Sequence, residues 1–178
     1  MTLHWTPSAE SVPGTRSRRH HRSEIFRSPG VPMSSSRKVA IVTGSATGVG
    51  AAAAILLAER GCHVLINYTR SEAEAKDTAR VCESKGAETL VFQGDVSDEA
   101  ACQGMARAAI EKWGRIDYLI NNAAKTKFNP YENLDGLTAE DFLAIYKVNV
   151  VGAYQMVRAV APQMKKQGRG AIVNNSSI

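Results

Sequence analysis

The sequence predicts an α/β domain in which helices cover both faces of a parallel sheet. Two observations indicate this class. Short runs rich in Val and Ile alternate with longer helical segments, and a Gly or a capping residue separates one segment from the next. Right-handed crossovers join the strands of such a sheet, so their carboxyl ends meet at one edge. Ligands of this fold class bind at that edge.

Five short apolar runs are predicted as strands, because their length and β-branched residues suit a parallel sheet. They are Lys38–Thr43, Cys62–Asn67, Glu88–Gln93, Ile116–Asn121 and Ala171 to about Ser176. We expect the fifth strand to be buried over Ala171–Val173 and to deliver polar side chains to the carboxyl edge.

Four helices are predicted between these strands: Val49–Arg60, Ser71–Ser84, Ser97 to about Trp113, and Thr138 to about Gln167. Ser71 and Glu74 form a capping-box pair, and Ser97 and Thr138 are suited to cap the third and fourth helices. A Gly follows each of the first three helices, as is common where a helix ends.

Residues 1–36 differ from the rest of the chain, because they are rich in Ser, Pro, Arg and His and lack apolar periodicity. Five Arg against two Glu give them +3 of the formal net charge of +5, so residues 37–178 carry only +2. We expect a disordered basic tail that need not belong to the native protein, followed by one domain that is not built to bind nucleic acid. The Arg-rich run at 16–22 leaves a phosphate-binding, nucleic-acid-binding or address-signal role of the tail open.

The cysteines are three in number, Cys62, Cys82 and Cys102, and no C-x-x-C pair or His-rich tract occurs. This predicts free thiols and neither a disulfide framework nor a metal site, and it favours a reducing compartment such as the cytoplasm. No apolar run reaches the roughly 18 residues of a membrane helix, so we expect no membrane partner.

The segment T-G-S-A-T-G-V-G, residues 43–50, follows the first predicted strand and opens the first predicted helix. Its glycines allow a tight turn and a close approach of the backbone to a pyrophosphate, and the helix N-terminus supplies free N–H groups. We therefore predict a dinucleotide-binding loop. Its candidate residues are Thr43, Gly44, Ser45, Thr47, Gly48, Val49 and Gly50.

The spacing T-G-x-x-x-G-x-G resembles the cofactor signature of the short-chain dehydrogenase/reductase family, and four further motifs agree with that family in order. These motifs are GDVSD with Asp95, NNAA at 121–124 with Ala124 where the family has Gly, KVNVVG with Asn149, and NNSSI with Ser177. The likeness covers Arg37–Ile178 and implies a Rossmann-type doubly wound sheet. It also implies that Asp95 and Val96 lie at the adenine, that Asn122, Ala123 and Ala124 line the cofactor site, and that Asn149 and Ser177 act in catalysis.

Several of these residues have a plainer interpretation. Asn149 is unfavourable in mid-helix, and a buried Asn that bonds backbone would also explain it. Asn121 and Asn122 could be turn residues, and Ser177 an ordinary strand-end hydroxyl. Lys125 and Lys127 are predicted as solvated loop charges, with contact to an acidic substrate as the alternative; His63 is expected in the core or at a sheet edge.

The end of the second strand bears on the choice of cofactor. It reads Asn67-Tyr68-Thr69-Arg70-Ser71, with a cation and without the acid that holds the ribose 2′-hydroxyl of NAD. We predict NADP in preference to NAD, with Tyr68 and Arg70 at the cofactor; Arg70 as a solvated loop cation is the alternative. Thr47 stands where many NADP-dependent relatives carry a basic side chain.

No Tyr-x-x-x-Lys occurs in the sequence, although the family carries this proton donor and its lysine beyond the catalytic Ser. Tyr154-x-x-x-Arg158 is the nearest pattern, and it lies in the fourth predicted helix. We expect a domain at 37–178 that is truncated after its fifth strand. Its parent would be an oxidoreductase for a ketone or alcohol, similar to 3-oxoacyl-carrier-protein reductases and homo-oligomeric. The alternative is a short product that binds nucleotide without catalysis.

Overall fold

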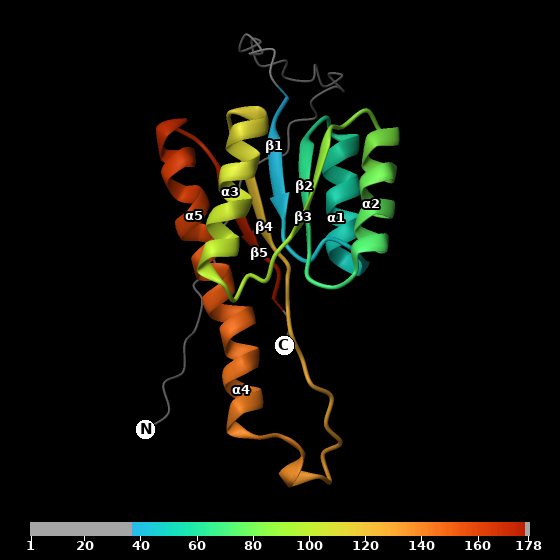
Figure 1. Ribbon diagram of the computed structural model, residues 1–178, viewed down its shortest axis with the longest axis vertical. Coiled ribbons are helices and arrows are strands. Elements are labelled where there is room, and N and C mark those ends of the chain that lie inside the picture. Colours follow the sequence, from blue (N-terminus) through green and yellow to red (C-terminus); the bar gives the residue numbers. More distant parts are fainter. Residues whose placement is uncertain (1–36, 177–178) are drawn as a thin grey trace, which may run out of the picture. The chain divides into compact units, whose positions relative to one another are not determined.

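The computed structural model describes residues 37–176, whose strands form one parallel sheet in the order β3–β2–β1–β4–β5. The strands are β1 Val39–Val42, β2 His63–Tyr68, β3 Thr89–Gln93, β4 Tyr118–Asn121 and β5 Ala171–Asn174. The order reverses at β1, which pairs with β2 on one side and β4 on the other, and this confirms the doubly wound α/β fold (Figure 1). The predicted tail at 1–36 and Ser177 lie outside the described residues.

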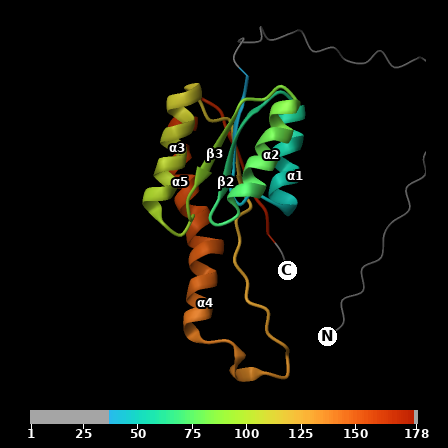
Figure 2. The same ribbon diagram turned by 45° about the vertical axis from the view of Figure 1, so that its right-hand side comes forward.

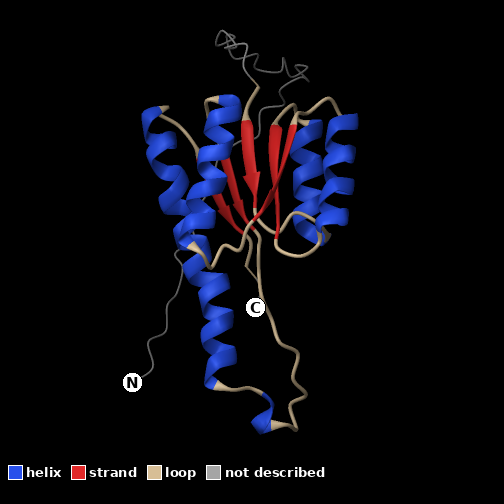
Figure 3. Ribbon diagram, in the orientation of Figure 1, coloured by secondary structure: helices blue, strands red, loops and turns tan. Residues whose placement is uncertain are grey.

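Two pairs of helices enclose this sheet (Figure 3). Helices α1 (Gly48–Glu59) and α2 (Glu72–Ser84) pack on one face, where Val42, Val64 and Ile66 meet their alanines. Helices α3 (Glu99–Trp113) and α5 (Ala153–Lys166) pack on the other face. The central strands β1, β2 and β4 bury apolar residues between the two helix layers. This close packing fixes the strands and holds their carboxyl ends side by side.

The long helix predicted from Thr138 to Gln167 is not a regular α-helix throughout. Its first part, α4 (Ala139–Tyr146), begins with a capping box between Thr138 and Asp141, and a π-helical segment follows at Lys147–Gly152 before α5. At Gly152 an added Cβ would lie 2.6 Å from Val96, so the glycine lets this segment approach the turn after β3. Helix α4 then extends past the carboxyl edge of the sheet (Figure 2).

The predicted caps of α2 and α3 are wrong in detail. Asp98, and not Ser97, caps α3: its side chain accepts a hydrogen bond from Ala100 N at 3.0 Å, while Ser97 lies one residue earlier, where its N–H donates to Asp95 Oδ1. Ser71 precedes α2, but its hydroxyl makes no capping hydrogen bond; its backbone lies outside the extended conformation that aims an N-cap side chain at the helix.

Strand β5 is exposed over all four residues, which corrects the expectation that Ala171–Val173 is buried. Among the described residues it is an edge strand, paired with β4 alone, and Val173 is 51% exposed. An apolar run predicts a strand, but the neighbours that would bury it are set by its place in the sheet.

All three cysteines are free, as predicted, and all three are buried. Burial raises the pKa of Cys82 and of Cys102 to about 11, so both stay protonated at neutral pH. Within the described residues no cluster of His, Cys, Asp and Glu could hold a metal ion. None of the described helices is both long and apolar enough to cross a membrane.

Candidate functional site

Two adjoining cavities lie along the carboxyl edge, where the arrowheads of the strands converge (Figure 1). The β4–β5 cavity has a volume of about 870 Å³ and lies between the ends of these strands and the start of α5. The β2–β3 cavity has a volume of about 720 Å³ and reaches from the glycine-rich loop to the start of α2. They share Val96, Asn122, Ala123 and Ala124, so they form one continuous cleft of a size suited to a small-molecule ligand.

The glycine-rich loop, Thr43–Gly50, lies at the centre of this cleft. Gly44 has a φ of +61°, and a Cβ there would lie 2.8 Å from the Cα of Ala123. A Cβ on Gly50 would lie 2.4 Å from the Asn122 amide nitrogen. Gly48 also has a positive φ, but a Cβ there would meet nothing within 4 Å. The first and third glycines therefore let the loop pack against the turn after β4, while the second leaves its outer surface open.

The open surface of the loop is also the start of α1. No acidic residue lies in the first turn of this helix, and the N-cap residue, Thr47, makes no side-chain capping hydrogen bond. Thr47 and Val49 are exposed. The free N–H groups and the positive end of the helix dipole are thus left to bind an anion, which fits the pyrophosphate of a dinucleotide.

A reciprocal set of hydrogen bonds joins the loop to the turn after β4. The Thr43 hydroxyl oxygen accepts from Asn122 N at 2.9 Å and from Ala123 N at 3.0 Å. In return the Asn122 side-chain amide donates to Thr43 O at 3.0 Å and to Gly44 O at 3.1 Å. Asn122 therefore acts as more than a turn residue, because it ties two ligand-facing segments together.

Two predicted cofactor residues lie behind the cleft surface. Ser45 is fully buried, and its hydroxyl donates to Val42 O at 2.7 Å and accepts from Asn67 N at 3.0 Å. Tyr68 is buried in the core beside α2. In this arrangement the side chains of both residues support the loop and β2 from within.

Asp95 and Arg70 line the β2–β3 cavity together. Asp95 is exposed, and its Oδ1 accepts a hydrogen bond from Ser97 N at 2.8 Å, which orders the turn after β3. Arg70 is exposed beside the start of α2. The cavity therefore has one carboxylate and one guanidinium, which come from the segments after β3 and β2.

Asn149 lies in the π-helical segment and lines the β4–β5 cavity. Its Oδ1 accepts from Lys125 N at 2.7 Å and its Nδ2 donates to Lys125 O at 3.0 Å. The side chain thus bonds backbone, as the plainer interpretation held, although the residue is exposed and not buried. Lys127 is not simply solvated, because it forms an ion pair of 2.5 Å with Asp141.

Sequence reasoning assigned no role to three further asparagines of this edge. Asn67 is 1% exposed and lines the β2–β3 cavity. Asn175 Nδ2 donates to Asn122 Oδ1 at 3.0 Å, and Asn174 Oδ1 accepts from Asn121 Nδ2 at 2.9 Å. Their signal in the sequence was the recurrence of Asn at the carboxyl end of apolar runs.

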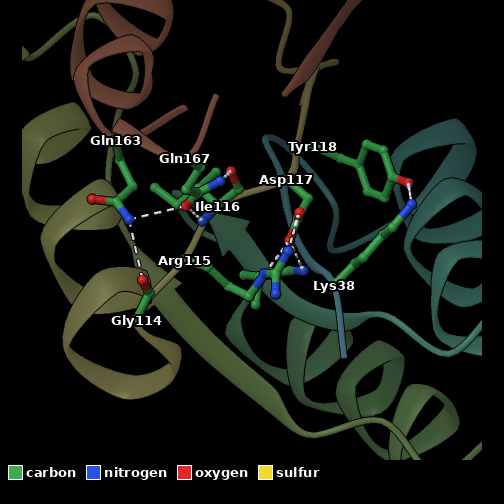
Figure 4. Close-up of polar contacts among 9 residues, drawn as sticks. Lys38, Gly114, Arg115, Ile116, Asp117, Tyr118, Gln163 and Gln167 are labelled. Carbon is green, nitrogen blue, oxygen red and sulfur yellow. Dashed lines mark hydrogen bonds and ion pairs between the residues drawn. The ribbon is translucent and has the colours of Figure 1, made fainter. Parts of the chain in front are cut away.

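The amino edge of the sheet holds polar clusters of another kind (Figure 4). Asp117 is buried, pairs with Arg115 through both carboxylate oxygens at 2.6 and 2.7 Å, and accepts from Val39 N at 2.9 Å. Gln167 accepts from Ile116 N at 2.9 Å and donates to Ile116 O at 2.8 Å. Each of these polar groups is hydrogen-bonded to another group of the protein, so together they stabilise this edge of the sheet.

Comparisons with known proteins agree with this geometry. The family model described as short chain dehydrogenase matches residues 38–178. An uncharacterized oxidoreductase of Thermotoga maritima is 40% identical over 79% of this chain and 53% of its own length. A 3-oxoacyl-[acyl-carrier-protein] reductase of Staphylococcus aureus is 31% identical over 79% of this chain and 56% of its own length. The solved NAD⁺-bound xylitol dehydrogenase is 33% identical, with a TM-score of 0.71 over 79% of this chain and 53% of that one. The chain spans about half the length of these relatives.

Proposed function

The chain belongs to the short-chain dehydrogenase family, and we propose that it is the cofactor-binding part of an NADP(H)-dependent oxidoreductase. One observation carries this proposal: the glycine-rich loop opens α1 in the middle of a continuous cleft and leaves a helix N-terminus free for a pyrophosphate. A bound nicotinamide dinucleotide supplies the hydride-transfer chemistry. The residues of the chain bind and orient the two halves of that molecule.

The assignment of the two halves follows the resemblance to the family, and the two cavities have room for it. Asp95 and Val96 would hold the adenine in the β2–β3 cavity. Gly44, Gly48 and the first turn of α1 would hold the pyrophosphate, and the turn at 122–124 would support the nicotinamide half at the entrance to the β4–β5 cavity.

The preference for NADP rests on Arg70. Arg70 lines the cavity assigned to the adenosine half, and the end of β2, residues 67–69, has no carboxylate where an NAD-binding unit has one. Asp95, which follows β3, is the one carboxylate among the described residues that line this cavity. Titration of the chain with NADPH and NADH, followed by nucleotide fluorescence, tests the preference; equal dissociation constants or tighter NADH binding would contradict it.

The proposed substrate of the whole protein is a ketone or alcohol, in the manner of 3-oxoacyl reductases. Asn149 and Ser177 would orient the groups around the reacting oxygen, with Ser177 donating a hydrogen bond to it. Since the 178 residues contain no Tyr-x-x-x-Lys, we expect them to give no turnover by themselves. An NADPH oxidation assay with simple ketones checks this, and a rate above that of the buffer would show it wrong.

A second candidate function is nucleotide binding without catalysis, which the same lack of a Tyr-x-x-x-Lys favours. The coding sequence downstream of Ile178 separates the two, because an open frame that reaches this motif supports the oxidoreductase and an immediate stop codon supports the binding protein.

Self-association is also part of the proposal. Helix α4, the π segment and α5 carry large apolar side chains that are about half exposed or more, and such patches favour contact between subunits. These residues are Phe142, Leu143, Tyr146, Val150 and Tyr154. The buried free thiols are consistent with a cytoplasmic location.

A further inference from the structure

Asn67, near the end of β2, connects two segments of the cleft that are far apart in the sequence. Its Oδ1 accepts a hydrogen bond from Gly44 N at 3.0 Å, in the glycine-rich loop. Its Nδ2 donates to Gly94 O at 2.8 Å and, more weakly, to Phe92 O at 3.4 Å, where the chain turns toward Asp95. A single buried amide therefore spans the gap between the loop after β1 and the turn after β3.

The backbone of Asn67 fixes this side chain in place. Asn67 N donates to the Ser45 hydroxyl at 3.0 Å, and Ser45 N donates to Asn67 O at 2.9 Å. The orientation of the amide is also determined, because the opposite orientation would set Oδ1 against two carbonyl oxygens and Nδ2 against an N–H group.

We propose that Asn67 is a positioning residue for the nucleotide, and that it sets the spacing between the glycine-rich loop and the turn at Gly94–Val96. This inference rests on the proposed dinucleotide function. A dinucleotide must contact both segments at once, so its affinity depends on the distance between them. The affinity of a smaller ligand that contacts only one segment does not depend on that distance.

An amide is required at this position because one side chain must accept from Gly44 and donate to Gly94. A carboxylate in the same place would keep the acceptor but turn a negative oxygen toward Gly94 O and Phe92 O. Burial among carbonyl oxygens would raise the pKa of that carboxyl well above its usual value, and only the protonated form could donate as the amide does.

The variant Asn67→Asp tests this by calorimetric titration of the 178-residue chain with NADP⁺ between pH 5 and pH 8. We expect an affinity close to that of the unchanged chain at pH 5 and a loss of about tenfold or more at pH 8, with the unchanged chain measured at each pH as the reference. Gln167→Glu is the matched control, because Gln167 also bridges an N–H and a C=O, but at the opposite edge. It should lower the melting temperature as the pH rises and leave the NADP⁺ affinity equal to the reference at every pH.

The outcomes are distinguishable. An unchanged chain that fails to bind NADP⁺ overturns the proposed function, and with it the inference. An unchanged chain that binds, together with an Asn67→Asp affinity that follows the reference at every pH, overturns the inference alone.

If Asn67→Asp does not fold at pH 8, Asn67→Ala is titrated with NADP⁺ and with adenosine 2′-monophosphate, which has no pyrophosphate. A loss of about tenfold for NADP⁺ and little for the monophosphate supports the proposal, and equal losses overturn it.

Discussion

The two edges of the sheet use polar side chains in opposite ways. At the amino edge, Asp117 is satisfied by Arg115 and Val39, and Gln167 by Ile116, so these polar groups find their hydrogen-bond partners within the protein. At the carboxyl edge, Asn122 and Asn67 also bond backbone, but what they hold are glycine turns whose outer surfaces face a cleft. Side-chain amides thus stabilise the amino edge, whereas at the carboxyl edge they position the turns that line the cleft.

The largest effect is expected at Gly44. Gly44→Ala places a side chain at a φ of +61° and 2.8 Å from the backbone of Ala123, so the loop must shift. We expect at least about a hundredfold weaker NADP⁺ binding and about 2–3 kcal/mol less stability. Gly61→Ala is the control at the amino edge, because it has a φ of +81° with open space around it. It should cost about 1 kcal/mol by thermal unfolding with unchanged affinity.

Asp117→Asn should destabilise the fold at the amino edge and leave the residues that line the cleft unchanged. It removes the carboxylate that binds Arg115 and Val39 N, and breaking such a buried pair costs about 3 kcal/mol. Chemical denaturation measures this loss. The opposite-edge control, Asp95→Asn, changes an exposed carboxylate, so its stability should stay within about 0.5 kcal/mol while NADP⁺ binds more weakly. A large loss of stability in Asp95→Asn would contradict the view that polar groups at the amino edge serve stability and those at the carboxyl edge serve binding.

The same aspartate predicts acid sensitivity. Burial by itself raises the pKa of Asp117, but the Arg115 guanidinium and the Val39 N–H outweigh it and hold the pKa below its usual value. Because the folded-state pKa is lowered, this contribution to stability is present above the unfolded pKa of about 4 and is lost as the pH falls through the folded value. Unfolding curves between pH 5 and pH 2 should show a smaller decline for Asp117→Asn than for the unchanged chain.

Arg70→Asp sharpens the comparison within the carboxyl edge. Since Arg70 lines the proposed adenosine cavity, the change should weaken NADPH by about tenfold and leave NADH equal or tighter. Fluorescence titration with both nucleotides measures the switch. Arg80→Asp is the control, because Arg80 is exposed like Arg70 but lies within α2 and does not line this cavity. The same shift in both variants would point to general charge and not to a specific contact.

The smallest effect concerns His63 at the amino edge. Its ring stacks on Trp113 and its Nδ1 accepts from Glu88 N at 2.9 Å, and burial lowers its pKa although Glu88 opposes this. A histidine with a lowered folded pKa loses stability as the pH falls through its unfolded pKa of about 6.5. We expect a Tm about 2 °C lower at pH 5.5 than at pH 7.5, and His63→Asn should remove that part of the pH dependence.

Much of the fold could be predicted because its signals are local. The apolar runs at Ile41 and Leu65, the glycines at 44, 48 and 50, and the cap at Thr138 act over a few residues, and the structure places all of them as predicted. The caps at Ser71 and Ser97 were not predicted correctly, because a side chain caps a helix only where the backbone dihedrals and the first residue of the helix place it correctly, and the surrounding turn sets both. The exposure of β5 depends on which strands and helices lie beside it, and this is not a local property.

The sequence by itself determined the alternation of strands and helices, the glycine-rich loop, and the family to which the chain belongs. Only the tertiary structure decided which of the candidate residues face the cleft. Ser45 and Tyr68 turned out to lie behind it, while Asn67, which had no assigned role, bridges Gly44 and Gly94. The reason is physical. A side chain's partners come from strands that pair across 20 to 80 residues of sequence, so its role depends on a register that no local pattern contains.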